Sequence, residues 1–413
     1  MCVKAVFLPP DFMRHGTVSP FLVSDGDSVL LNSSKSLLIR ELIARFLYCR
    51  ELVPVRSSDS EDVRVVHRSL SVVRDAAGSQ DAVTVDVGDC GAAFRFLMAL
   101  LAVTEGEWLL TGTTHLLQRP VTPLVTALRT AGAAITPAPN GWHITGRPLH
   151  AETLTVDCAL SSQFASALLL IGPKIGLKEL KTLPATPPSA PYIEMTRRVL
   201  DGVLSGTPLR READWSTAAF WYAFVRLSPD VDSLLLRDLR LDSQQGDFVI
   251  SQIFSELWVS SKQKNEGVFI EKMPNLNQNF NRDFNLSLNL KSNPDLAPVL
   301  AVTAAMLGVQ CTLTGLENLN LKESRRLDVL AQELAPFANV SVEDGTLQID
   351  GRKMPSKGSG TPMNVHTHGD HRMVMAFSLL FFKYDVHLSD IECVRKSYPE
   401  FENYFKPAPR IGK

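Results

Sequence analysis

The 413-residue sequence has no long hydrophobic run and little net charge. Its apolar stretches, such as residues 94–103 and 164–172, are much shorter than the ~20 residues that a membrane-spanning helix needs. The net charge of −2 excludes a broad basic surface for nucleic acid, so any anion site must be a local cluster of cations. Residues 1–12 hold only a short apolar run broken by prolines, so we expect no signal peptide or anchor, and a cytoplasmic protein.

Paired cysteines and nucleotide-binding loops are absent as well. The six cysteines are scattered and form no Cys-x-x-Cys pair, which is typical of reduced thiols in a cytosolic protein. Neither a Gly-x-Gly-x-x-Gly loop nor a Gly-x-x-x-x-Gly-Lys-Ser/Thr loop occurs. Any phosphate that the protein binds is therefore expected on a substrate rather than on a nucleotide.

One segment carries the letters of a metal site. Residues 366–371 read HTHGDH, the zinc motif of metallo-β-lactamase-like hydrolases. Those enzymes need further ligands downstream, and only one histidine, His387, follows. The next residues instead form a helical core stripe that includes Met373, Phe377 and Phe381. The sequence therefore favours a protein without a metal site here, and metal analysis of the purified protein would test that choice.

The chain repeats itself at about half its length. It is too long for one compact core, so two domains are expected. A β-rich segment, Leu-Thr-Gly, a polar loop and a helix follow one another twice, and the glycines of the two copies, Gly112 and Gly315, are 203 residues apart. Arg119 and Lys322, the basic residues of the two loops, share that offset. The spacing indicates two homologous halves.

Weaker copies of the same unit occur elsewhere, and we count five, with the remnant of a sixth near residues 33–47. Each copy brings a polar loop to a helix N-terminus, where free backbone N–H groups favour anions. A solenoid is the alternative, but the periods are uneven and the units are mixed α/β. If the halves face one another, these loops converge on one cleft.

The loops carry an unusual number of cations. The segment LKESRRLDVL places Lys322, Arg325 and Arg326 around Glu323, just before the apolar stripe of an amphipathic helix. Arginine forks match carboxylate and phosphate groups, so several converging cations predict a substrate with several negative charges. Such a cluster would repel itself when empty, and we expect the cleft to close on its ligand. The candidate cations are Lys35, Arg40, Arg95, Arg119, Lys322, Arg326, Arg372 and Lys396.

Eight motifs in order resemble one family over nearly the full chain. They are SKSxxxR, GxxGxxxR, QRP, SSQF, PYIEMT, the NPD aspartate, KESxR and DHRM. This is the order found in 5-enolpyruvylshikimate-3-phosphate synthase, the 3-phosphoshikimate 1-carboxyvinyltransferase of the shikimate pathway and hence of chorismate and aromatic amino acid biosynthesis. The resemblance implies an α/β fold of two similar domains, each of three βαβαββ units, the inside-out α/β barrel of enolpyruvyl transferases. Residues 1–32 and 213–413 would form domain I, residues 33–212 domain II, with the active site in the cleft between them.

The same resemblance implies the reaction and its ligands. The enzymes of that family transfer the enolpyruvyl group of phosphoenolpyruvate to the 5-hydroxyl of shikimate 3-phosphate, without a metal or cofactor, and we expect a monomer. The implied shikimate 3-phosphate ligands are Lys35, Ser36, Arg40, Ser161, Ser162, Gln163, Ser189, Tyr192, Asp295, Asn318 and Lys322. The implied phosphoenolpyruvate ligands are Lys35, Gly91, Arg119, Gln163, Arg326, Arg372 and Lys396.

The reaction needs a base and an acid, because an alcohol loses a proton and a methylene gains one. By resemblance, Asp295 is the expected base. Glu323 is the first candidate for the methylene proton, and Lys396 and Lys35 are the rival proton carriers.

The sequence also departs from the family pattern. The usual GNAGTAMR is GDCGAAFR here, so Asp89 replaces an asparagine that normally touches phosphoenolpyruvate. We expect this carboxylate to weaken donor binding unless it is protonated or paired with a cation such as Arg95 or Arg119. Arg325 replaces an aspartate, while Gly91 is kept, which predicts sensitivity to glyphosate. A non-catalytic protein that binds shikimate 3-phosphate and an enolpyruvyl transferase acting on UDP-N-acetylglucosamine are the alternatives, but the latter's reactive cysteine loop has no match.

Overall fold

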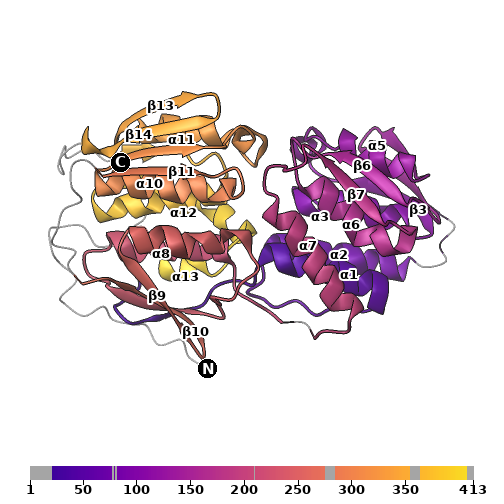
Figure 1. Cartoon of the computed structure of the whole chain (residues 1–413), viewed down its shortest axis with the longest axis horizontal. Coiled ribbons are helices and arrows are strands. Elements are labelled where there is room, and N and C mark those ends of the chain that lie inside the picture. The colour runs from indigo at the N-terminus through magenta and orange to yellow at the C-terminus, as the bar shows by residue number, and fades with distance from the viewer. Residues whose placement is uncertain are drawn as a thin grey trace, which may run out of the picture.

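The computed structural model describes residues 21–76, 79, 81–208, 210–274, 284–353 and 363–406. These residues form two lobes that lie side by side along the longest axis of the molecule (Figure 1). Each lobe has its own hydrophobic core: one is built from residues between Leu38 and Val203, the other from residues 21–31 and residues between Ala213 and Phe405. Most of the first thirty residues lie outside the described part of the chain. The exact domain boundaries remain a prediction, and the two separate cores support it.

The lobe whose core lies between Leu38 and Val203 is the first lobe. Its described residues form six strands and seven helices. The strands are β2 (Val83–Asp86), β3 (Gly106–Thr111), β4 (Ala134–Ala138), β5 (Gly141–Gly146), β6 (Thr153–Asp157) and β7 (Glu179–Leu183). The helices are α1 (Lys35–Cys49), α2 (Glu61–Asp75), α3 (Gly91–Ala102), α4 (Thr114–Leu117), α5 (Thr122–Thr130), α6 (Gln163–Ile175) and α7 (Pro191–Leu204).

The second lobe holds the remaining described elements. Its strands are β1 (Ser28–Val29), β8 (Ser233–Arg237), β9 (Val259–Lys264), β10 (Gly267–Lys272), β11 (Asn285–Asn289), β12 (Gln310–Thr314), β13 (Asn339–Glu343), β14 (Thr346–Asp350), β15 (Met363–Val365) and β16 (Val386–Leu388). Its α-helices are α8 (Trp215–Leu227), α9 (Ile250–Glu256), α10 (Ala297–Leu307), α11 (Arg326–Leu334), α12 (His371–Ser378) and α13 (Phe401–Tyr404). Its 3₁₀ turns are η2 (Gly246–Val249), η3 (Pro294–Leu296), η4 (Leu319–Leu321), η5 (Gly351–Lys353), η6 (Leu379–Phe382) and η7 (Ile391–Lys396).

The sheets confirm the internal repeat. The orders β2-β3-β5-β4, β1-β8-β10-β9 and β11-β12-β14-β13 are equivalent: the first pair of strands is parallel and the next two pairs are antiparallel. Gly112 follows β3 and Gly315 follows β12, as the 203-residue offset predicts. The tight β13–β14 hairpin turns at Asp344 and Gly345, whose φ angles are 44° and 71°, the left-handed conformation that such two-residue turns require.

Helices that are apolar on every side occupy the centre of each lobe. In α10 every residue from Ala297 to Ala305 is buried, and α3 is buried along nearly its whole length. In the second lobe, α8, α10 and α12 lie between the sheet of β9 and β10 and the sheet of β13 and β14 (Figure 1). This arrangement follows from the sequence, since a helix without a polar face has to be surrounded by protein. No helix in the described ranges is both long and apolar enough to cross a membrane.

Candidate active site

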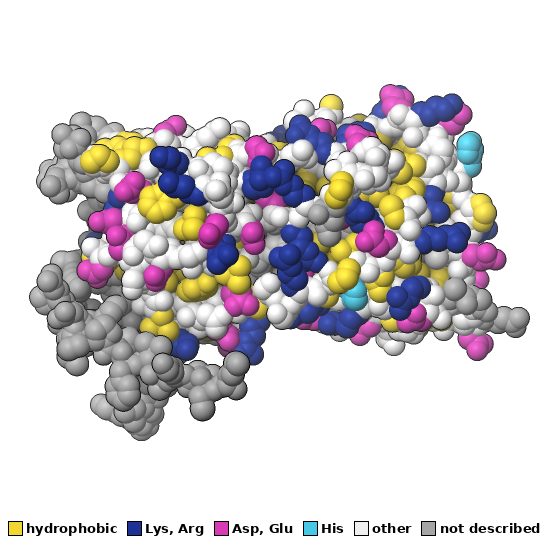
Figure 2. All heavy atoms as spheres, turned by 90° about the horizontal axis from the view of Figure 1, so that it is seen from below, with side chains coloured by type: hydrophobic (Ala, Val, Ile, Leu, Met, Phe, Trp, Pro, Cys, Tyr) yellow, Lys and Arg dark blue, Asp and Glu magenta, His cyan; other side chains and the backbone are white. Residues whose placement is uncertain are grey.

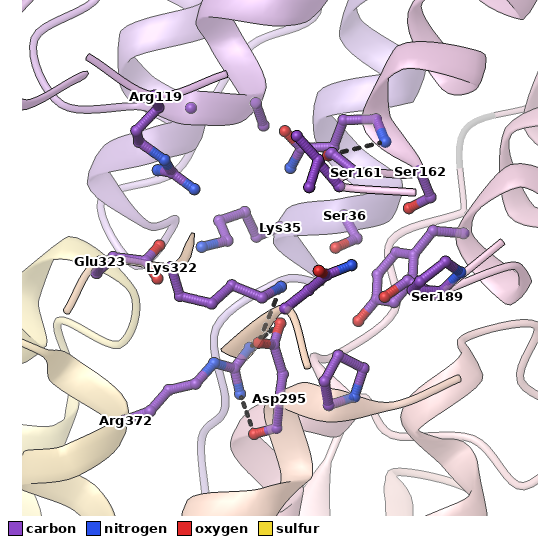
Figure 3. A pocket seen from close by; sticks show the side chains of 18 of the residues that line it. Lys35, Ser36, Arg119, Ser161, Ser162, Ser189, Asp295, Lys322, Glu323 and Arg372 are labelled. Carbon is purple, nitrogen blue, oxygen red and sulfur yellow. Dashed lines mark hydrogen bonds and ion pairs between the residues drawn. The ribbon is translucent and has the colours of Figure 1, made fainter. Parts of the chain in front are cut away.

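A cavity lies between the two lobes, and side chains of both lobes line it (Figure 3). On the face seen in Figure 2, Lys and Arg side chains occur together with Asp and Glu where the lobes meet. Of the residues that the sequence predicts for the site, Arg326 and Lys396 do not line the cavity; Arg326 contacts the lining residues Asp295 and Glu323, and Lys396 contacts Asp89. The other predicted residues line the cavity: Lys35, Ser36, Arg40, Gly91, Arg119, Ser161, Ser162, Gln163, Ser189, Tyr192, Asp295, Asn318, Lys322, Glu323 and Arg372.

The start of α1 holds Lys35 at the centre of the cavity. The hydroxyl of Ser34 caps the helix by accepting a bond from the amide of Leu37, so Lys35 is its first residue. The Lys35 ammonium lies 3.0 Å from a carboxylate oxygen of Asp62 on α2. Burial alone would lower the pKa of Lys35, but the charges of Asp62 and Glu323 outweigh it and raise the pKa above its usual range. Lys35 is therefore protonated at neutral pH.

Arg40, one turn further along α1, is a buried guanidinium without a carboxylate partner among the described residues; its exposed fraction is 3%. It donates to the Thr196 hydroxyl at 2.7 Å and to the Ser36 carbonyl at 2.8 Å. The rings of Phe96 and Tyr192 flank it, with centroids 5.1 and 5.8 Å away. Burial lowers the pKa of Arg40 to about 10. The group stays charged at neutral pH and is fixed in place before any anion arrives.

Gly91, the first residue of α3, lets two arginines approach the cavity. A Cβ at this position would lie 2.8 Å from Nη1 of Arg119 and 2.9 Å from Nη1 of Arg95. Arg95 donates to the Gln163 side-chain oxygen at 2.8 Å, and burial together with the charge of Arg119 lowers the pKa of Arg95 to about 9. Arg119 forms no ion pair with a described residue, and its Nε has no hydrogen-bond partner there. It points into the cavity from the first lobe (Figure 3).

The first lobe also supplies three serines near helix starts. Ser161 and Ser162 precede α6, and the amide of Gln163 donates to the Ser161 hydroxyl at 3.3 Å. Ser189 precedes α7 and has a φ of 57°, which is uncommon for a residue with a side chain. The Ser189 amide donates to the carbonyl of Lys291 at 2.9 Å, so this strained residue sits where one lobe touches the other.

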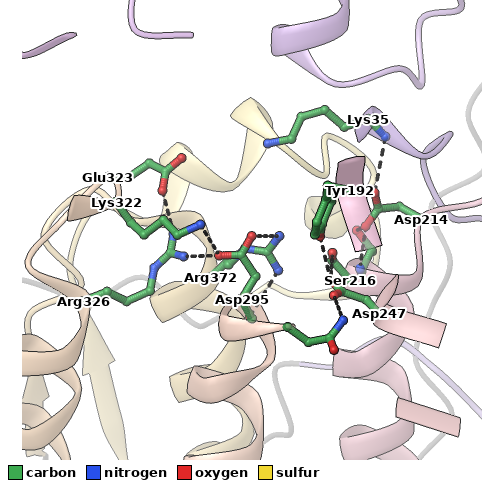
Figure 4. Close-up of polar contacts among 12 residues, drawn as sticks. Lys35, Tyr192, Asp214, Ser216, Asp247, Asp295, Lys322, Glu323, Arg326 and Arg372 are labelled. Atoms are coloured by element: carbon green, nitrogen blue, oxygen red, sulfur yellow. Dashed lines mark hydrogen bonds and ion pairs between the residues drawn. The ribbon is translucent and has the colours of Figure 1, made fainter. Parts of the chain in front are cut away.

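Asp295, on η3 of the second lobe, is surrounded by three cations (Figure 4). Its carboxylate lies 2.9 Å from Arg326, 3.3 Å from Lys322 and 3.4 Å from Arg372. Burial would raise the pKa of Asp295, but Arg372, Lys322 and Arg326 together hold the pKa far below its usual range. Asp295 is therefore ionised but is a very weak base while all three cations stay on it.

Arg326, the first residue of α11, is only 1% exposed and touches three carboxylates. It lies 2.9 Å from Asp295, 2.8 Å from Glu323 and 2.8 Å from Asp370. The expectation that the empty cation cluster repels itself is therefore wrong for the second lobe, because carboxylates already neutralise its cations. Burial opposes charge on Arg326, yet Asp370, Glu323 and Asp295 raise its pKa above the usual range.

Glu323 is ionised in this arrangement. Burial would raise the pKa of Glu323, but the charges of Arg326 and Arg119 lower it well below its usual value. Because Glu323 is ionised, it would have to take up a proton before it could donate one to the methylene carbon. Lys35 and Lys396 already carry one: burial lowers the pKa of Lys396, but Glu323, Asp62 and Asp89 raise it above its ordinary value.

Asp89 is paired with a cation, but the partners named from the sequence are wrong. Asp89 pairs with Lys396 of the second lobe at 2.8 Å, not with Arg95 or Arg119. Burial would raise the pKa of Asp89, but the Lys396 ammonium lowers it below its usual value. The other altered position does not line the cavity: Arg325 is exposed and pairs with Asp328 on the surface at 2.7 Å.

Asp62 and His371 are among the lining residues that were not predicted for the cavity. Asp62 neutralises Lys35, and only tertiary structure brings α2 to α1, so the sequence holds no signal for this pair. His371 belongs to the DHRM motif and is 3% exposed, and neither ring nitrogen has a hydrogen-bond partner in the described part of the chain. Burial lowers the pKa of His371 to about 3, so its ring is neutral.

The HTHGDH segment, residues 366–371, has a structural role that involves a helix cap and an ion pair. Asp370 caps α12 by accepting a bond from the amide of Arg372 at 2.9 Å, and it also pairs with Arg326. Its carboxylate is thus committed to a helix end and a guanidinium. The described residues contain no group of three His, Cys, Asp or Glu arranged to hold a metal ion.

Solved structures define the class of fold. An EPSP synthase from Acinetobacter baumannii has a TM-score of 0.62 at 17% identity and covers 92% of this chain and 95% of its own. The enolpyruvyl transferase NikO from Streptomyces tendae has a TM-score of 0.61 at 14% identity, with coverages of 92% and 95%. The fold is therefore the two-domain fold of the enolpyruvyl transferases.

Sequence relatives define the family. The family model for EPSP synthase (3-phosphoshikimate 1-carboxyvinyltransferase) matches residues 43–204 and 202–405. A 3-phosphoshikimate 1-carboxyvinyltransferase from Bacteroides fragilis is 31% identical, with 91% of this chain and 93% of that protein covered. Its counterpart from Dehalococcoides mccartyi is 29% identical, with 91% and 94% covered. This chain belongs to the EPSP synthase family.

Proposed function

We propose that the chain catalyses the reaction of its family: transfer of the enolpyruvyl group of phosphoenolpyruvate to the 5-hydroxyl of shikimate 3-phosphate, with release of phosphate. The observation that carries this proposal is the cavity itself, which is lined by an ionised carboxylate, Asp295, and by cations from both lobes. Two small substrates that together carry two phosphates and two carboxylates fit such a cavity, because each anionic group can meet a separate cation.

The acceptor, shikimate 3-phosphate, lies against the first lobe in this proposal. Its phosphate meets the hydroxyls of Ser161 and Ser162 beside the N-terminus of α6, where backbone N–H groups favour an anion. Arg40 is fixed and has no carboxylate partner among the described residues, so it can bind the acceptor's carboxylate without first giving up an ion pair. The remaining proposed contacts are Lys35, Ser36, Gln163, Ser189, Tyr192, Asp295, Asn318 and Lys322.

The donor, phosphoenolpyruvate, bridges the lobes. Arg119 reaches it over Gly91 from the first lobe. Arg326, Arg372 and Lys396 come from the second lobe, and Lys35 and Gln163 complete the set. These guanidinium and ammonium groups would also stabilise the charge that develops on the departing phosphate.

Substrate binding activates the base in this proposal. Asp295 accepts the proton of the attacking 5-hydroxyl, and it can do so only when its pKa rises from its depressed value. The three cations that depress this pKa are all proposed ligands of substrate anions. Each cation that leaves Asp295 for a substrate anion allows the pKa of Asp295 to rise. Asp295 therefore becomes basic enough to accept the proton when both substrates are bound.

The methylene proton has three candidate carriers, Glu323, Lys396 and Lys35. The carrier takes a proton back from the resulting methyl group as the C–O bond to phosphate breaks, which restores the double bond in the product. The lysines carry protons in the ligand-free protein, whereas Glu323 must receive one first, for example from the attacking hydroxyl through Asp295 or solvent. Each step uses side chains alone, so we propose no metal or cofactor. We further propose a cytoplasmic monomer whose only partners are its small-molecule substrates, with no nucleic acid or membrane.

A phosphate-release assay tests this function. The wild-type protein with both substrates should release inorganic phosphate, and Asp295→Asn should remove that activity. Asp242→Asn, a change at an exposed surface pair with Arg240, is the matched control and should keep it. Folded wild-type protein that binds shikimate 3-phosphate by calorimetry but releases no phosphate from pH 6 to 9 would refute catalysis and establish the non-catalytic alternative.

A further inference from the structure

Asp89 lies at a place where the two lobes touch. It belongs to the loop between β2 and α3 of the first lobe, and its carboxylate lies 2.8 Å from the ammonium of Lys396, at the end of η7 in the second lobe. The same ammonium donates to the Asp89 carbonyl at 3.3 Å. Among ion pairs between described residues, this is the only one that joins residues 33–212 to the rest of the chain.

The carboxylate of Asp89 is held in position by its own lobe. The Thr113 hydroxyl donates to Oδ1 at 3.0 Å, and Nδ1 of His115 lies 3.1 Å from the same oxygen. These two contacts leave Oδ2 free to face Lys396, and it is Oδ2 that forms the ion pair. The side chains of Lys396 and Asp89 are 22% and 34% exposed, so the pair is partly shielded from water.

We propose that Asp89 is a built-in competitor of the donor substrate: it occupies Lys396, ties the lobes together in the ligand-free protein, and has to release Lys396 before the donor's phosphate can bind it. This proposal rests on the proposed function, in which Lys396 is a phosphoenolpyruvate ligand. Two effects act in the same direction. Asp89 neutralises a cation that the donor needs, and it places a negative charge beside an anionic substrate.

The consequence is a selective cost to donor binding. The proposed acceptor contacts, in both lobes, include neither Asp89 nor Lys396, so acceptor affinity should depend little on this pair. An uncharged side chain of the same shape at position 89 would free Lys396 and remove the repulsion, and donor binding should then become tighter. A gain in affinity is not a result that simple damage to the fold would produce.

Kinetics of Asp89→Asn test the proposal. Relative to wild type, the KM for phosphoenolpyruvate should fall about fivefold, the factor typical of losing one partly exposed ion pair. The KM for shikimate 3-phosphate should change less than about twofold. Asp75→Asn, which removes the same charge from an exposed helix end of the same lobe, is the control and should change neither value. An unchanged or higher KM for phosphoenolpyruvate in Asp89→Asn would overturn the proposal.

A binding measurement separates this proposal from the proposed function. Calorimetric titration of inorganic phosphate should give a dissociation constant about fivefold lower for Asp89→Asn than for wild type. If Asp89→Asn binds phosphate more tightly than wild type but neither protein turns over the substrates, the catalytic function is refuted and the competition by Asp89 is supported. Equal phosphate affinity in the two proteins would overturn the competition, whatever the turnover.

Discussion

The two walls of the cavity hold their arginines in opposite ways. In the first lobe, Arg40 and Arg119 have no carboxylate partner among the described residues, and Arg40 is fixed by two hydroxyls, two carbonyls and two rings. In the second lobe, Arg326 touches three carboxylates and Asp295 touches three cations. The first wall is ready for an anion, whereas the second wall must exchange an internal partner for a substrate. The difference predicts that the first wall supplies affinity and that the second couples binding to catalysis.

The largest expected effect is on stability, from Arg326→Met. It leaves the buried carboxylates of Asp370, Glu323 and Asp295 without this cation, and breaking a buried pair in this way costs ~3–5 kcal/mol. Urea denaturation measures the free energy of unfolding. A loss below ~1 kcal/mol would show that the second wall does not depend on its internal pairing.

Arg40→Met is the counterpart in the first wall. Arg40 compensates no described carboxylate, so the free energy of unfolding should fall by only ~1 kcal/mol from its lost hydrogen bonds. The KM for shikimate 3-phosphate should rise ~30-fold, because a buried charge-assisted contact to the acceptor is worth ~2 kcal/mol. Both effects are read from one protein preparation by denaturation and initial-rate kinetics. A stability loss as large as that of Arg326→Met would abolish the distinction between the two walls.

The pH dependence of stability follows from the second wall. The pKa values of Asp295, Glu323 and Asp370 are lowered by their cations against the opposing effect of burial, so these carboxylates bind fewer protons in the folded than in the unfolded protein. Their contribution is present above the ordinary values, about 4, and is lost as pH falls through the lowered ones. The free energy of unfolding should drop by at least ~2 kcal/mol from pH 6 to pH 3.

The same series with Asp295→Asn isolates one of these carboxylates. Its stability should depend less steeply on pH, because one lowered pKa is gone, while Asp75→Asn should keep the wild-type slope. Identical slopes in all three proteins would mean that Asp295 is not held ionised by its cations.

Gly91→Ala tests the approach of Arg119 in the first wall. The new methyl group would force Arg119 and Arg95 from their present positions, 2.8 and 2.9 Å from an added Cβ. The KM for phosphoenolpyruvate should rise ~10-fold, equivalent to ~1.4 kcal/mol, with little change for the acceptor. Gly202→Ala in α7 is the matched control, since its Cβ would find its nearest neighbour 3.8 Å away. Equal kinetics for the two variants would show that Arg119 does not need the space over Gly91.

Arg325→Asp, which restores the family's usual residue, should have the smallest effect. Arg325 is exposed and pairs only with Asp328 on α11 among the described residues. The two acids that would then lie three positions apart repel weakly, so stability should fall by no more than ~0.5 kcal/mol. The kinetic constants should stay within about twofold of wild type. A tenfold gain in activity would show that position 325 affects the cavity from a distance.

The sequence predicts the repeat and most of the cavity because both are local patterns. Gly112 and Gly315 mark equivalent turns, and motifs such as SSQF and KESRR place their polar residues directly before helices. The apolar stripe predicted after Arg326 appears in α11, where Leu327, Leu330 and Leu334 are buried.

The pairings inside the cavity could not be predicted, because they join distant segments. Lys396 meets Asp89, 307 residues away, and Asp62 meets Lys35 through the packing of two helices. The charge state of Asp295 depends on three such pairings at once. Residue types indicate that cations and carboxylates meet, but only the tertiary structure decides which carboxylate neutralises which cation. It therefore also decides which wall can bind an anion directly and which wall must first break an internal ion pair.

A crystal structure of the wild-type protein with shikimate 3-phosphate and inorganic phosphate bound would test the switching of the second wall most directly. The account predicts that Arg40 and Arg119 bind the ligands with little movement, while Lys322 and Arg372 leave Asp295 for ligand oxygens. Both ligands bound in the cavity with the three ion pairs of Asp295 intact would contradict it.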